Sequence, residues 1–524
     1  MYTLDALTRV LGMAHLQGDP HVVVSGVEYD SRRVESGQVF ICVPGLKVDG
    51  HEFANAAVEN GCAALVVERF MPQLAHVPQM VVKSARRALA RLGAVFCGRP
   101  ADEMTIVGIT GTNGKTTASH FCEAVLKNRE KNCGLIGTIH SKIGGQSVPM
   151  ANTTPESLHL HQMLREMRNC GQDAAVMEVS SHALELERVH NLPFDVAVFT
   201  NLTHDHLDFH GTMEAYYEAK LKLFKSLSYR KGRCAPYAVI NVDDPYGRRM
   251  ISHLKVPYIT YGTDPSAHLR ALDIEASLEG VSYTLDSPLG EMRVNLGLSG
   301  MFNVFNSLAA VGVGIALKGE LQEIVNAVES VARVSGRFEL VREGQDFSVV
   351  VDYAHTPDGL ENLLQSARQV ATGQLITVFG CGGDRDRAKR PVMGEIAARL
   401  SDMVVLTSDN PRSEDPEQIL AEIQVGLHDS ATSWEIEVER SAAIFRAISL
   451  ASPGDIVVIA GKGHETYQLV GSEVLPFDDR EVARKALRGR ALRAARPRVQ
   501  ASIWTDRRRM SASAEMNAVV VNES

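Results

Sequence analysis

The stretch T-I-V-G-I-T-G-T-N-G-K-T-T, residues 105–117, decides the fold of this 524-residue chain. Its first six residues predict a buried strand, and residues 118–127 predict the helix that follows. Glycines between strand and helix let backbone N–H groups turn inward on phosphate oxygens, and the helix N-terminus adds its dipole. Lys115 can then reach the β- and γ-phosphates, and a threonine hydroxyl can bind Mg²⁺. The strict phosphate-loop pattern has glycine where this chain has Ile109, so the stretch predicts a variant nucleotide-binding loop.

Strands and helices are expected to alternate beyond this loop. Apolar runs that end at polar residues recur at 174–179, 196–200 and 238–241, which predicts a parallel sheet wrapped by helices. After residue 334 the same rhythm returns and predicts another α/β unit. Its expected strands are 348–351, 375–379, 403–407 and 456–460.

The domain boundaries follow from these patterns. Residues 1–98 mix short apolar runs with turn residues and predict a small α/β domain. The next domains are expected at 99–334 and 335–495. The last stretch, 496–524, is Arg-rich and then small and polar, and we expect it to be a flexible tail.

Composition and charge exclude several classes of protein. Hydrophobic residues make up 45% and charged residues 22%, which excludes a mostly disordered chain. The net charge of -9 disfavours a dedicated nucleic-acid binder, and no apolar run approaches the ~20 residues needed to cross a bilayer. The eight cysteines are scattered without a C-x-x-C pair, and the N-terminus has no apolar signal core. We therefore expect a cytoplasmic protein with no nucleic-acid partner and no membrane insertion.

A second cluster of polar residues follows the next predicted strands. Glu178 stands near the carboxyl end of the strand at 174–179, where a parallel α/β domain can hold Mg²⁺ beside a phosphate loop. Three histidines and two aspartates crowd residues 201–210, in N-L-T-H-D-H-L-D-F-H. Taken alone, this second segment is also compatible with a transition-metal site.

From the loop onward the chain resembles the Mur ligases, the ATP-dependent amide-forming enzymes of peptidoglycan precursor synthesis. T-G-T-N-G-K-T-T is their form of the loop, and D-H-L-D at 205–208 and Y-E-A-K at 217–220 match two further segments. The resemblance implies a catalytic group of Lys115, Glu178, His206 and a carbamylated Lys220, with Mg²⁺ held by Thr116, Glu178, His206 and Lys220. A desolvated lysine can lose its proton, and carbamylation turns it into an oxygen ligand suited to Mg²⁺. The implied ATP contacts are Gly111, Thr112, Asn113, Gly114, Lys115, Thr116, Thr117, Asn303, Arg337, Asp352 and His355.

Two further motifs resemble the branch of this family that adds the third amino acid of the peptide. They are Y-D-S-R at 29–32 and N-T-T-P at 152–155. The implied contacts of the nucleotide-sugar peptide are Ser31, Asn152, Thr153, Thr154, Ser180 and Arg188. Two positions depart from the pattern: Leu186 stands where glutamine is usual, and His204 stands where arginine often precedes D-H-L-D. One hydrogen bond to the substrate is therefore expected to be lost or moved at Leu186.

The third domain carries the segments that shape the amino-acid pocket in this family. They are G-C-G-G-D-R-D at 380–386, D-N-P-R at 409–412 and G-K-G-H-E at 461–465. D-N-P-R is the form associated with meso-diaminopimelate rather than L-lysine. A guanidinium can grip the distal carboxylate in a bidentate fork, whereas it repels the bare ammonium end of lysine. The implied pocket residues are Arg385, Asp409, Asn410, Pro411, Arg412, Gly461 and Glu465.

The resemblance thus implies both a fold and a reaction. The fold is three α/β domains: a small N-terminal UDP-sugar-binding domain, a central parallel-sheet phosphate-loop ATPase domain, and a Rossmann-like C-terminal domain for the amino acid and ATP. The reaction joins meso-diaminopimelate to UDP-MurNAc-L-Ala-D-Glu through an acyl phosphate, with ATP as co-substrate, in a monomer. Folylpolyglutamate synthetase shares the loop and the carbamate, but it gives no reason for D-S-R at 30–32 or for D-N-P-R. A GTPase-type switch would need an N-K-x-D guanine reader, which the sequence lacks.

Overall fold

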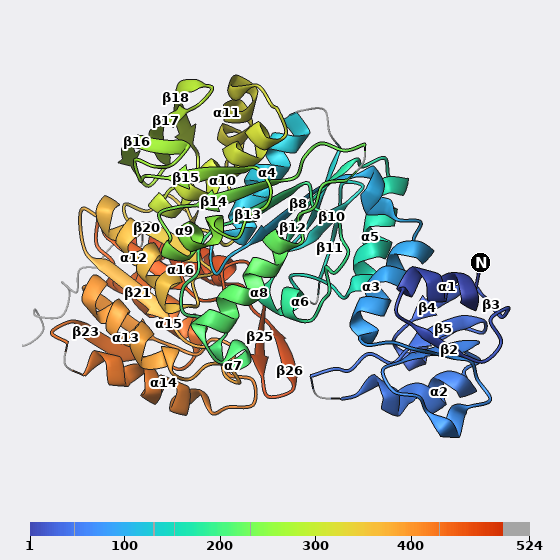
Figure 1. Ribbon diagram of the computed structural model, residues 1–524. Helices are drawn as coiled ribbons and strands as arrows, with labels where there is room; N and C mark the ends of the chain where they lie inside the picture. Colours follow the sequence, from blue (N-terminus) through green and yellow to red (C-terminus); the bar gives the residue numbers. More distant parts are fainter. Residues whose placement is uncertain (47, 129–131, 151, 231, 429, 496–524) are drawn as a thin grey trace, which may run out of the picture.

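Three large β-sheets, each covered by helices, follow one another along the chain (Figure 1). The computed structural model describes residues 1–495 except 47, 129–131, 151, 231 and 429, so the expected tail at 496–524 lies outside the described residues. The α/β architecture with parallel sheets that the sequence predicts is confirmed. None of the helices in the described part of the chain is long and apolar enough to cross a membrane.

The first sheet lies in the N-terminal part of the chain. The strands are β1 (Tyr2–Thr3), β2 (His15–Gln17), β3 (Val23–Val24), β4 (Gly26–Glu28), β5 (Gln38–Ile41), β6 (Ala64–Val67) and β7 (Gln79–Val81), and the helices are α1 (Leu4–Leu11), α2 (Ala54–Glu59) and α3 (Ala85–Phe96). The order is β2-β7-β6-β5-β4, parallel except for the β2–β7 pair, and β1 pairs separately with β3. Leu7 of α1 and Leu89 of α3 pack on one face of the sheet, and Ala57 of α2 packs on the other.

The second sheet is the largest and surrounds the nucleotide-binding loop. Its strands are β8 (Thr105–Thr110), β9 (Cys133–Ile136), β10 (Ser141–Ile143), β11 (Gln146–Val148), β12 (Ala174–Glu178), β13 (Val196–Phe199), β14 (Tyr237–Asn241), β15 (Tyr258–Gly262), β16 (Leu269–Ala276), β17 (Val281–Ser287) and β18 (Gly290–Leu296). The order is β11-β10-β9-β12-β8-β13-β14-β15-β16-β17-β18, parallel from β9 to β16 and antiparallel at both edges. The sequence predicts the parallel part. The β16–β18 edge was not predicted, because β16 and β17 alternate buried with partly exposed residues instead of forming apolar runs.

Helices cover both faces of this sheet. They are α4 (Lys115–Asn128), α5 (Ser157–Asn169), α6 (Ser181–Glu185), α7 (Leu207–His210), α8 (Met213–Lys225), α9 (Pro245–Ile251), α10 (Met301–Ala316) and α11 (Leu321–Glu329). Val107 and Ile109 of β8 pack with α4 and α10, whereas Ile106 packs with α5 and α8. This alternation buries β8 on both sides. The carboxyl ends of the parallel strands are where a site is expected in such a sheet.

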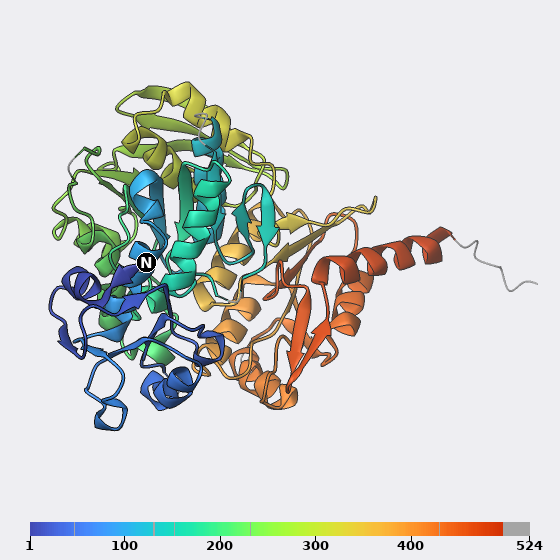
Figure 2. The ribbon, with the colours of Figure 1, turned by 90° about the vertical axis from the view of Figure 1, so that its right-hand side faces the viewer.

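The third sheet forms the C-terminal part of the described chain. Its strands are β19 (Glu339–Leu340), β20 (Ser348–Asp352), β21 (Leu375–Phe379), β22 (Met403–Leu406), β23 (Ser433–Ile436) and β24 (Ile456–Ala460), its helices are α12 (Pro357–Val370), α13 (Lys389–Leu400), α14 (Pro416–Gln424), α15 (Arg440–Leu450) and α16 (Asp479–Ala495), and β25 (Tyr467–Val470) and β26 (Glu473–Pro476) form a hairpin. The order is β19-β20-β24-β21-β22-β23, parallel except for β19. Helices α12, α13 and α14 pack on one face, and α15 and α16 on the other. Figure 2 shows α16 extending away from the rest of the molecule.

Candidate functional site

The nucleotide-binding loop runs from β8 to the first turn of α4, and two of its glycines are required by close contacts. Gly111 has φ 156°, and a Cβ built there would lie 1.8 Å from Oγ1 of Thr200. Gly114 has φ 85°, in the left-handed region, and its Cβ would lie 2.4 Å from Oδ1 of Asn306. Because no side chain fits at either position, the loop backbone stays accessible for a phosphate.

Lys115 is the first residue of α4, and its side chain folds back on the loop. Its Nζ donates to the carbonyl oxygens of Gly111, at 3.0 Å, and Thr112, at 2.9 Å. Burial lowers the pKa of Lys115, and the negative charges of Glu178 and Asp205 oppose that shift. The cation is therefore already beside the backbone that would hold the phosphates.

Glu178, at the end of β12, is held by hydroxyl and backbone donors. Its side chain accepts from Oγ1 of Thr116 at 3.0 Å, and from the backbone N and Oγ1 of Thr138 at 2.8 and 2.9 Å. Arg337 reaches across from the C-terminal domain and donates to Oγ1 of Thr116 at 3.1 Å. Thr138 was missed at the sequence level, since a single threonine 40 residues before Glu178 carries no signal of its own.

Lys220, on α8, is a buried lysine beneath the loop. Its side chain is only 1% exposed, and Nζ donates to the carbonyl of Gly111 at 2.8 Å. The ammonium also lies 4.3 Å from the ring centroid of Tyr216. Burial lowers the pKa of Lys220 well below its usual value, and the positive charge of Lys115 lowers it further. Lys220 can therefore lose its proton and present the uncharged amine that carbamylation requires.

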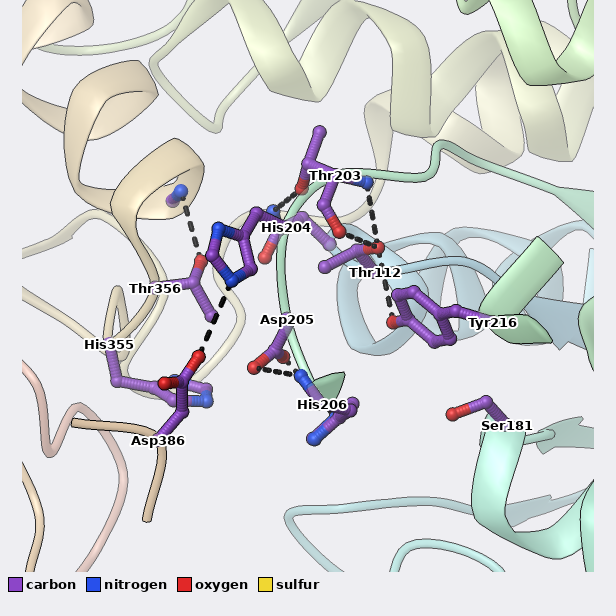
Figure 3. A network of polar contacts seen from close by, with 12 residues as sticks. Thr112, Ser181, Thr203, His204, Asp205, His206, Tyr216, His355, Thr356 and Asp386 are labelled. Carbon is purple, nitrogen blue, oxygen red and sulfur yellow. Dashed lines mark hydrogen bonds and ion pairs between the residues drawn. The ribbon is translucent and has the colours of Figure 1, made fainter. Parts of the chain in front are cut away.

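His206 and its neighbours lie between the loop and the C-terminal domain (Figure 3). His206 adopts a left-handed backbone with φ 55°, and its Nε2 is 3.2 Å from Oδ2 of Asp205. Burial lowers the pKa of His206, although Asp205 opposes the shift, so the ring is neutral and can act as a ligand. His204, one of the departures from the family pattern, places Nε2 3.4 Å from Oδ2 of Asp386 in the C-terminal domain.

A pocket of about 620 Å³ lies between the central and C-terminal domains. It is of the size that holds a small-molecule ligand. The predicted residues that line it are Thr112, Asn113, Gly114, Lys115, Thr116, Thr117, Thr153, Glu178, Ser180, His206, Arg337, Asp352 and His355. Its wall also contains Asp358, whose Oδ2 accepts from Nδ2 of Asn113 at 2.6 Å and so links the two domains.

Of three further predicted ATP contacts, Asp352 and His355 line this pocket and Asn303 lies behind it. Asn303 is fully buried and accepts from Nδ2 of Asn306 at 3.0 Å, and it is Asn306 that lines the pocket. Asp352 accepts from the backbone N of Phe338 and of Ala354, both at 2.7 Å, so it fixes the loop after β20; burial raises its pKa. Burial, and then the charge of Lys389, lowers the pKa of His355 to about 4.

The residues predicted to bind the nucleotide-sugar peptide form a connected group around Thr154. Oγ1 of Thr154 donates to the Glu178 carbonyl at 2.9 Å and accepts from the Ser180 backbone N at 3.0 Å. Nη1 of Arg188 donates to the Thr154 carbonyl at 3.0 Å. Oγ1 of Thr153 lies 3.1 Å from Oγ1 of Thr138, and Asn152 is exposed.

Two predictions for this substrate lie near the N-terminal domain. Ser31 is buried in a 3-10 turn, where its carbonyl accepts from Nδ2 of Asn60 at 2.9 Å. Leu186 ends α6, and its carbonyl accepts from Nη1 of Arg86, on α3 of the N-terminal domain, at 3.3 Å. A leucine side chain cannot make the hydrogen bond of the usual glutamine, and the contact with Arg86 uses the backbone carbonyl and does not depend on the side chain.

The seven residues predicted to form the amino-acid pocket lie together on loops at the carboxyl ends of β21, β22 and β24. Arg412 has φ 52°, and its Nη1 donates to the Gly383 carbonyl at 2.7 Å. Arg412 and Arg385 both flank Gly382, where a Cβ would lie 2.8 Å from Nη1 of Arg412 and 3.9 Å from Cγ of Arg385. Burial lowers the pKa of Arg412, and the charge of Arg385 lowers it further. A Cβ at Gly461 would lie 2.5 Å from Oδ2 of Asp409, which explains the glycine.

The same pocket contains a cation that the sequence analysis did not include. Lys462 is fully buried, and its Nζ donates to Oε2 of Glu465 at 2.9 Å and to Oδ1 of Asn410 at 3.1 Å. Nδ2 of Asn410 also donates to Oε2 of Glu465, at 2.9 Å. Lys462 therefore adds a third cation to Arg385 and Arg412 in this pocket.

Comparisons with known proteins cover all three sheets. Three family models match: the Mur ligase family catalytic domain at 23–96, the Mur ligase middle domain at 109–314 and the Mur ligase glutamate ligase domain at 336–463. The UDP-N-acetylmuramoyl-L-alanyl-D-glutamate--2,6-diaminopimelate ligase of Geobacillus thermodenitrificans is 48% identical over 486 residues, or 92% of this chain and 99% of that protein. The protein of the same name from Bacillus cereus is 46% identical over 469 residues, covering 89% and 94%.

Solved structures extend the similarity to the fold. A structure of UDP-N-acetylmuramoyl-L-alanyl-D-glutamate--2,6-diaminopimelate ligase matches with a TM-score of 0.67 and 34% identity, covering 94% of this chain and 99% of that one. A Mycobacterium tuberculosis folylpolyglutamate synthase complexed with ADP and AMPPCP shares the fold, with a TM-score of 0.60 and 18% identity over 72% of this chain and 92% of its own. Given relatives nearly half identical over about nine-tenths of its length, the chain belongs to the Mur ligase family.

Proposed function

We propose that this chain is an ATP-dependent ligase that joins meso-diaminopimelate to UDP-MurNAc-L-Ala-D-Glu in peptidoglycan precursor synthesis. The observation that carries the proposal is the amino-acid pocket, in which Arg412 and Arg385 flank Gly382 and the carboxylates of Asp409 and Glu465 lie on the neighbouring loops. This pairing suits a zwitterionic distal end, with its carboxylate toward the arginines and its ammonium toward the carboxylates. The relatives named for this reaction match nearly the whole chain.

The first step would transfer the γ-phosphoryl group of ATP to the side-chain carboxylate of D-glutamate. A carboxylate oxygen forms a bond to phosphorus, the bond to the ADP oxygen breaks, and an acyl phosphate and ADP result. Lys115 and Arg337 would neutralise charge on the phosphoryl oxygens from opposite sides of the domain boundary, since both already contact the loop. Positioning and charge neutralisation of this kind account for most catalysis of phosphoryl transfer.

The residues beside the loop fit a magnesium ion. Thr116 and Glu178 provide oxygen atoms, His206 provides a neutral ring nitrogen, and Lys220 provides an amine that can add to CO₂, releasing a proton and leaving a carbamate oxygen. A bound Mg²⁺ would supply positive charge to the phosphoryl oxygens. The role of this chain is to hold those ligands in place, through Thr138 on Glu178 and through Asp205 on His206.

In the second step the amine of meso-diaminopimelate would attack the acyl carbon. A C–N bond forms, the tetrahedral intermediate collapses, and phosphate leaves with the amine proton. The pocket around Arg412 fixes the distal end of the amino acid, which orients the reacting amine toward the acyl phosphate.

The domains divide the substrates between them in this proposal. Residues 1–98 bind the UDP-sugar, residues 99–334 bind ATP, and residues 335–495 bind the amino acid and part of ATP. We also propose that the chain acts as a monomer. The eight cysteines are free thiols, which supports a reducing compartment such as the cytoplasm.

The test is phosphate release by the purified chain with ATP, Mg²⁺ and UDP-MurNAc-L-Ala-D-Glu, with the product identified by mass spectrometry. We expect release that depends on meso-diaminopimelate and a product one diaminopimelate residue heavier. L-Lysine and a folate substrate should each give much less product. Product from folate and glutamate, with none from the UDP-sugar peptide, would refute the proposal and favour the folylpolyglutamate reaction.

A further inference from the structure

We propose that Lys462 is a positioning residue that sets the charge of the amino-acid pocket, so that the pocket accepts a zwitterionic distal end and rejects a bare ammonium. This inference rests on the proposed function. It concerns a side chain that does not reach solvent, since Lys462 is fully buried. It therefore acts through the side chains that it contacts: Glu465 and Asn410, which accept its hydrogen bonds, and the Tyr467 ring, whose centroid lies 5.6 Å from Nζ.

Lys462 neutralises the carboxylate that the substrate's ammonium would otherwise meet at full charge. Its Nζ is 2.9 Å from Oε2 of Glu465, and this oxygen also accepts from Asn410. A fully buried lysine requires such a partner, because an unpaired charge there would be very costly. The second carboxylate oxygen of Glu465 has no hydrogen bond from Lys462 or Asn410, and it is the one that we assign to the substrate.

Lys462 also fixes Asn410 in one orientation. Oδ1 of Asn410 accepts from Nζ of Lys462 at 3.1 Å and from the Leu469 backbone N at 2.9 Å, so its amide group has to point toward Glu465. Asn410 belongs to the loop that ends at Arg412 and pairs with the β25 strand. The lysine thus connects the glutamate to the loop that carries the predicted carboxylate reader.

The charges in this pocket balance only when Lys462 is counted. Arg385, Arg412 and Lys462 are positive, and Asp384, Asp409 and Glu465 are negative. Arg440 does not change this balance, because it forms a fully buried bidentate pair with Asp479. The distal end of diaminopimelate is neutral in sum, whereas that of lysine is cationic. The balanced pocket therefore suits diaminopimelate, and loss of the Lys462 charge would leave a net negative pocket that attracts lysine.

The decisive experiment compares kcat/KM for meso-diaminopimelate and for L-lysine in wild type, K462M, E465Q and K462M/E465Q. Met is close to Lys in shape and has no charge. We define the ratio as kcat/KM for meso-diaminopimelate divided by kcat/KM for L-lysine. In K462M this ratio should fall by about tenfold or more, because Glu465 then attracts the lysine ammonium at full charge. In E465Q the ratio should rise, because Lys462 then lacks its carboxylate partner and repels the lysine ammonium. In the double variant it should return toward the wild-type value.

This reciprocal pattern separates positioning from a general structural role. A structural role predicts an equal fall for both amino acids and no recovery in the double variant, and that result would overturn the inference. The KM values for ATP and the UDP-sugar peptide should stay within about twofold of wild type, because these substrates bind elsewhere. Lys485, exposed on α16 of the same domain, provides the matched control K485M, for which we expect the wild-type ratio.

Two other outcomes remain informative. If K462M alone does not fold, the comparison of E465Q with K462M/E465Q replaces it, and the ratio should fall from the first to the second. An unchanged ratio there would overturn the inference. If wild type does not ligate meso-diaminopimelate, the proposed function fails and the inference fails with it. If wild type does so and the ratio is the same in all variants, only the inference fails.

Discussion

Arg412→Ala should change which diamino acid is accepted more than it changes the general rate. Meso-diaminopimelate and L-lysine have the same reacting end and differ at the distal carboxylate. Only a group that binds this carboxylate can distinguish them by attraction. Arg412 is half-buried, and its Nη1 donates to the Gly383 carbonyl at 2.7 Å, which orients the rest of the guanidinium.

The magnitude follows from this partial burial. Truncating one side of a buried, hydrogen-bonded charge pair costs about 2–5 kcal/mol, and a half-buried guanidinium belongs at the low end. A loss of about 2–3 kcal/mol corresponds to a roughly 30- to 150-fold fall in kcat/KM for meso-diaminopimelate. Alanine would keep the left-handed backbone, with φ 52°, and would lose the Gly383 contact. Those costs fall on both amino acids equally.

The assay therefore compares, between wild type and variants, the ratio of kcat/KM for meso-diaminopimelate to kcat/KM for L-lysine. We would measure kcat/KM for both amino acids in wild type, Arg412→Ala and Arg412→Lys. Turnover of L-lysine should fall little or rise, since repulsion of its ammonium is relieved. Arg412→Lys keeps the charge and loses the planar fork, so its ratio should be intermediate. An equal fall for both amino acids in Arg412→Ala would show that Arg412 only supports the loop, and the assignment of the substrate would lose its main physical argument.

Three further substitutions test the loop, the buried lysine and the electrostatics of α4. Lys115→Ala should reduce kcat about 10²- to 10³-fold, through loss of ~3–4 kcal/mol of transition-state stabilisation; more than a tenth of wild-type kcat in steady-state phosphate release would contradict the assignment. Lys220→Ala should be nearly inactive and partly rescued by short-chain carboxylates, and a plain ammonium at Lys220 in a well-resolved Mg²⁺-ATP complex would refute the carbamate. For Glu123, burial raises the pKa, but hydrogen bonds from His120, Lys127 and Lys142 outweigh it and lower the pKa from 4.5 to about 2. A carboxylate whose pKa is lower in the folded than in the unfolded state stabilises the fold at pH values above the unfolded pKa. At neutral pH the free energy of unfolding of the wild type should therefore exceed that of Glu123→Gln by about 3 kcal/mol. Thermal unfolding should show this advantage vanishing between pH 4.5 and 2, and a constant difference would contradict it.

Local sequence signals predict the centre of this site well. The strand β8, the glycine loop and α4 follow one another without a break, so an apolar run, two glycines and a helix identify them together. The proximity of Glu178 to the loop also follows from the sequence, because the carboxyl ends of parallel strands meet at one edge of a sheet. In the structure, β12 and β8 are adjacent and parallel.

Contacts between distant segments could not be predicted in this way. Thr138 holds Glu178 from a loop, and Asp358 reaches Asn113 from another domain. A threonine in a loop and an aspartate in the first turn of a helix are both common, and only the packing of the sheets brings these pairs together. Lys462 lies in the G-K-G-H-E motif, but its role could not be predicted from the sequence, because the burial of a lysine depends on the surrounding fold.

Two of the cations that contact the loop, Arg337 and Lys115, differ in what ATP would require of them. A threonine hydroxyl has one donor and two acceptor positions. That of Thr116 donates to Glu178 and accepts from Arg337, which leaves one lone pair for a metal ion without moving either partner. The ammonium of Lys115 has three donors, and two of them already bind the loop carbonyls of Gly111 and Thr112. Arg337 and Thr116 are thus arranged for the nucleotide in advance, whereas Lys115 has to exchange at least one carbonyl for phosphate oxygens, so the reorganisation on ATP binding falls on Lys115.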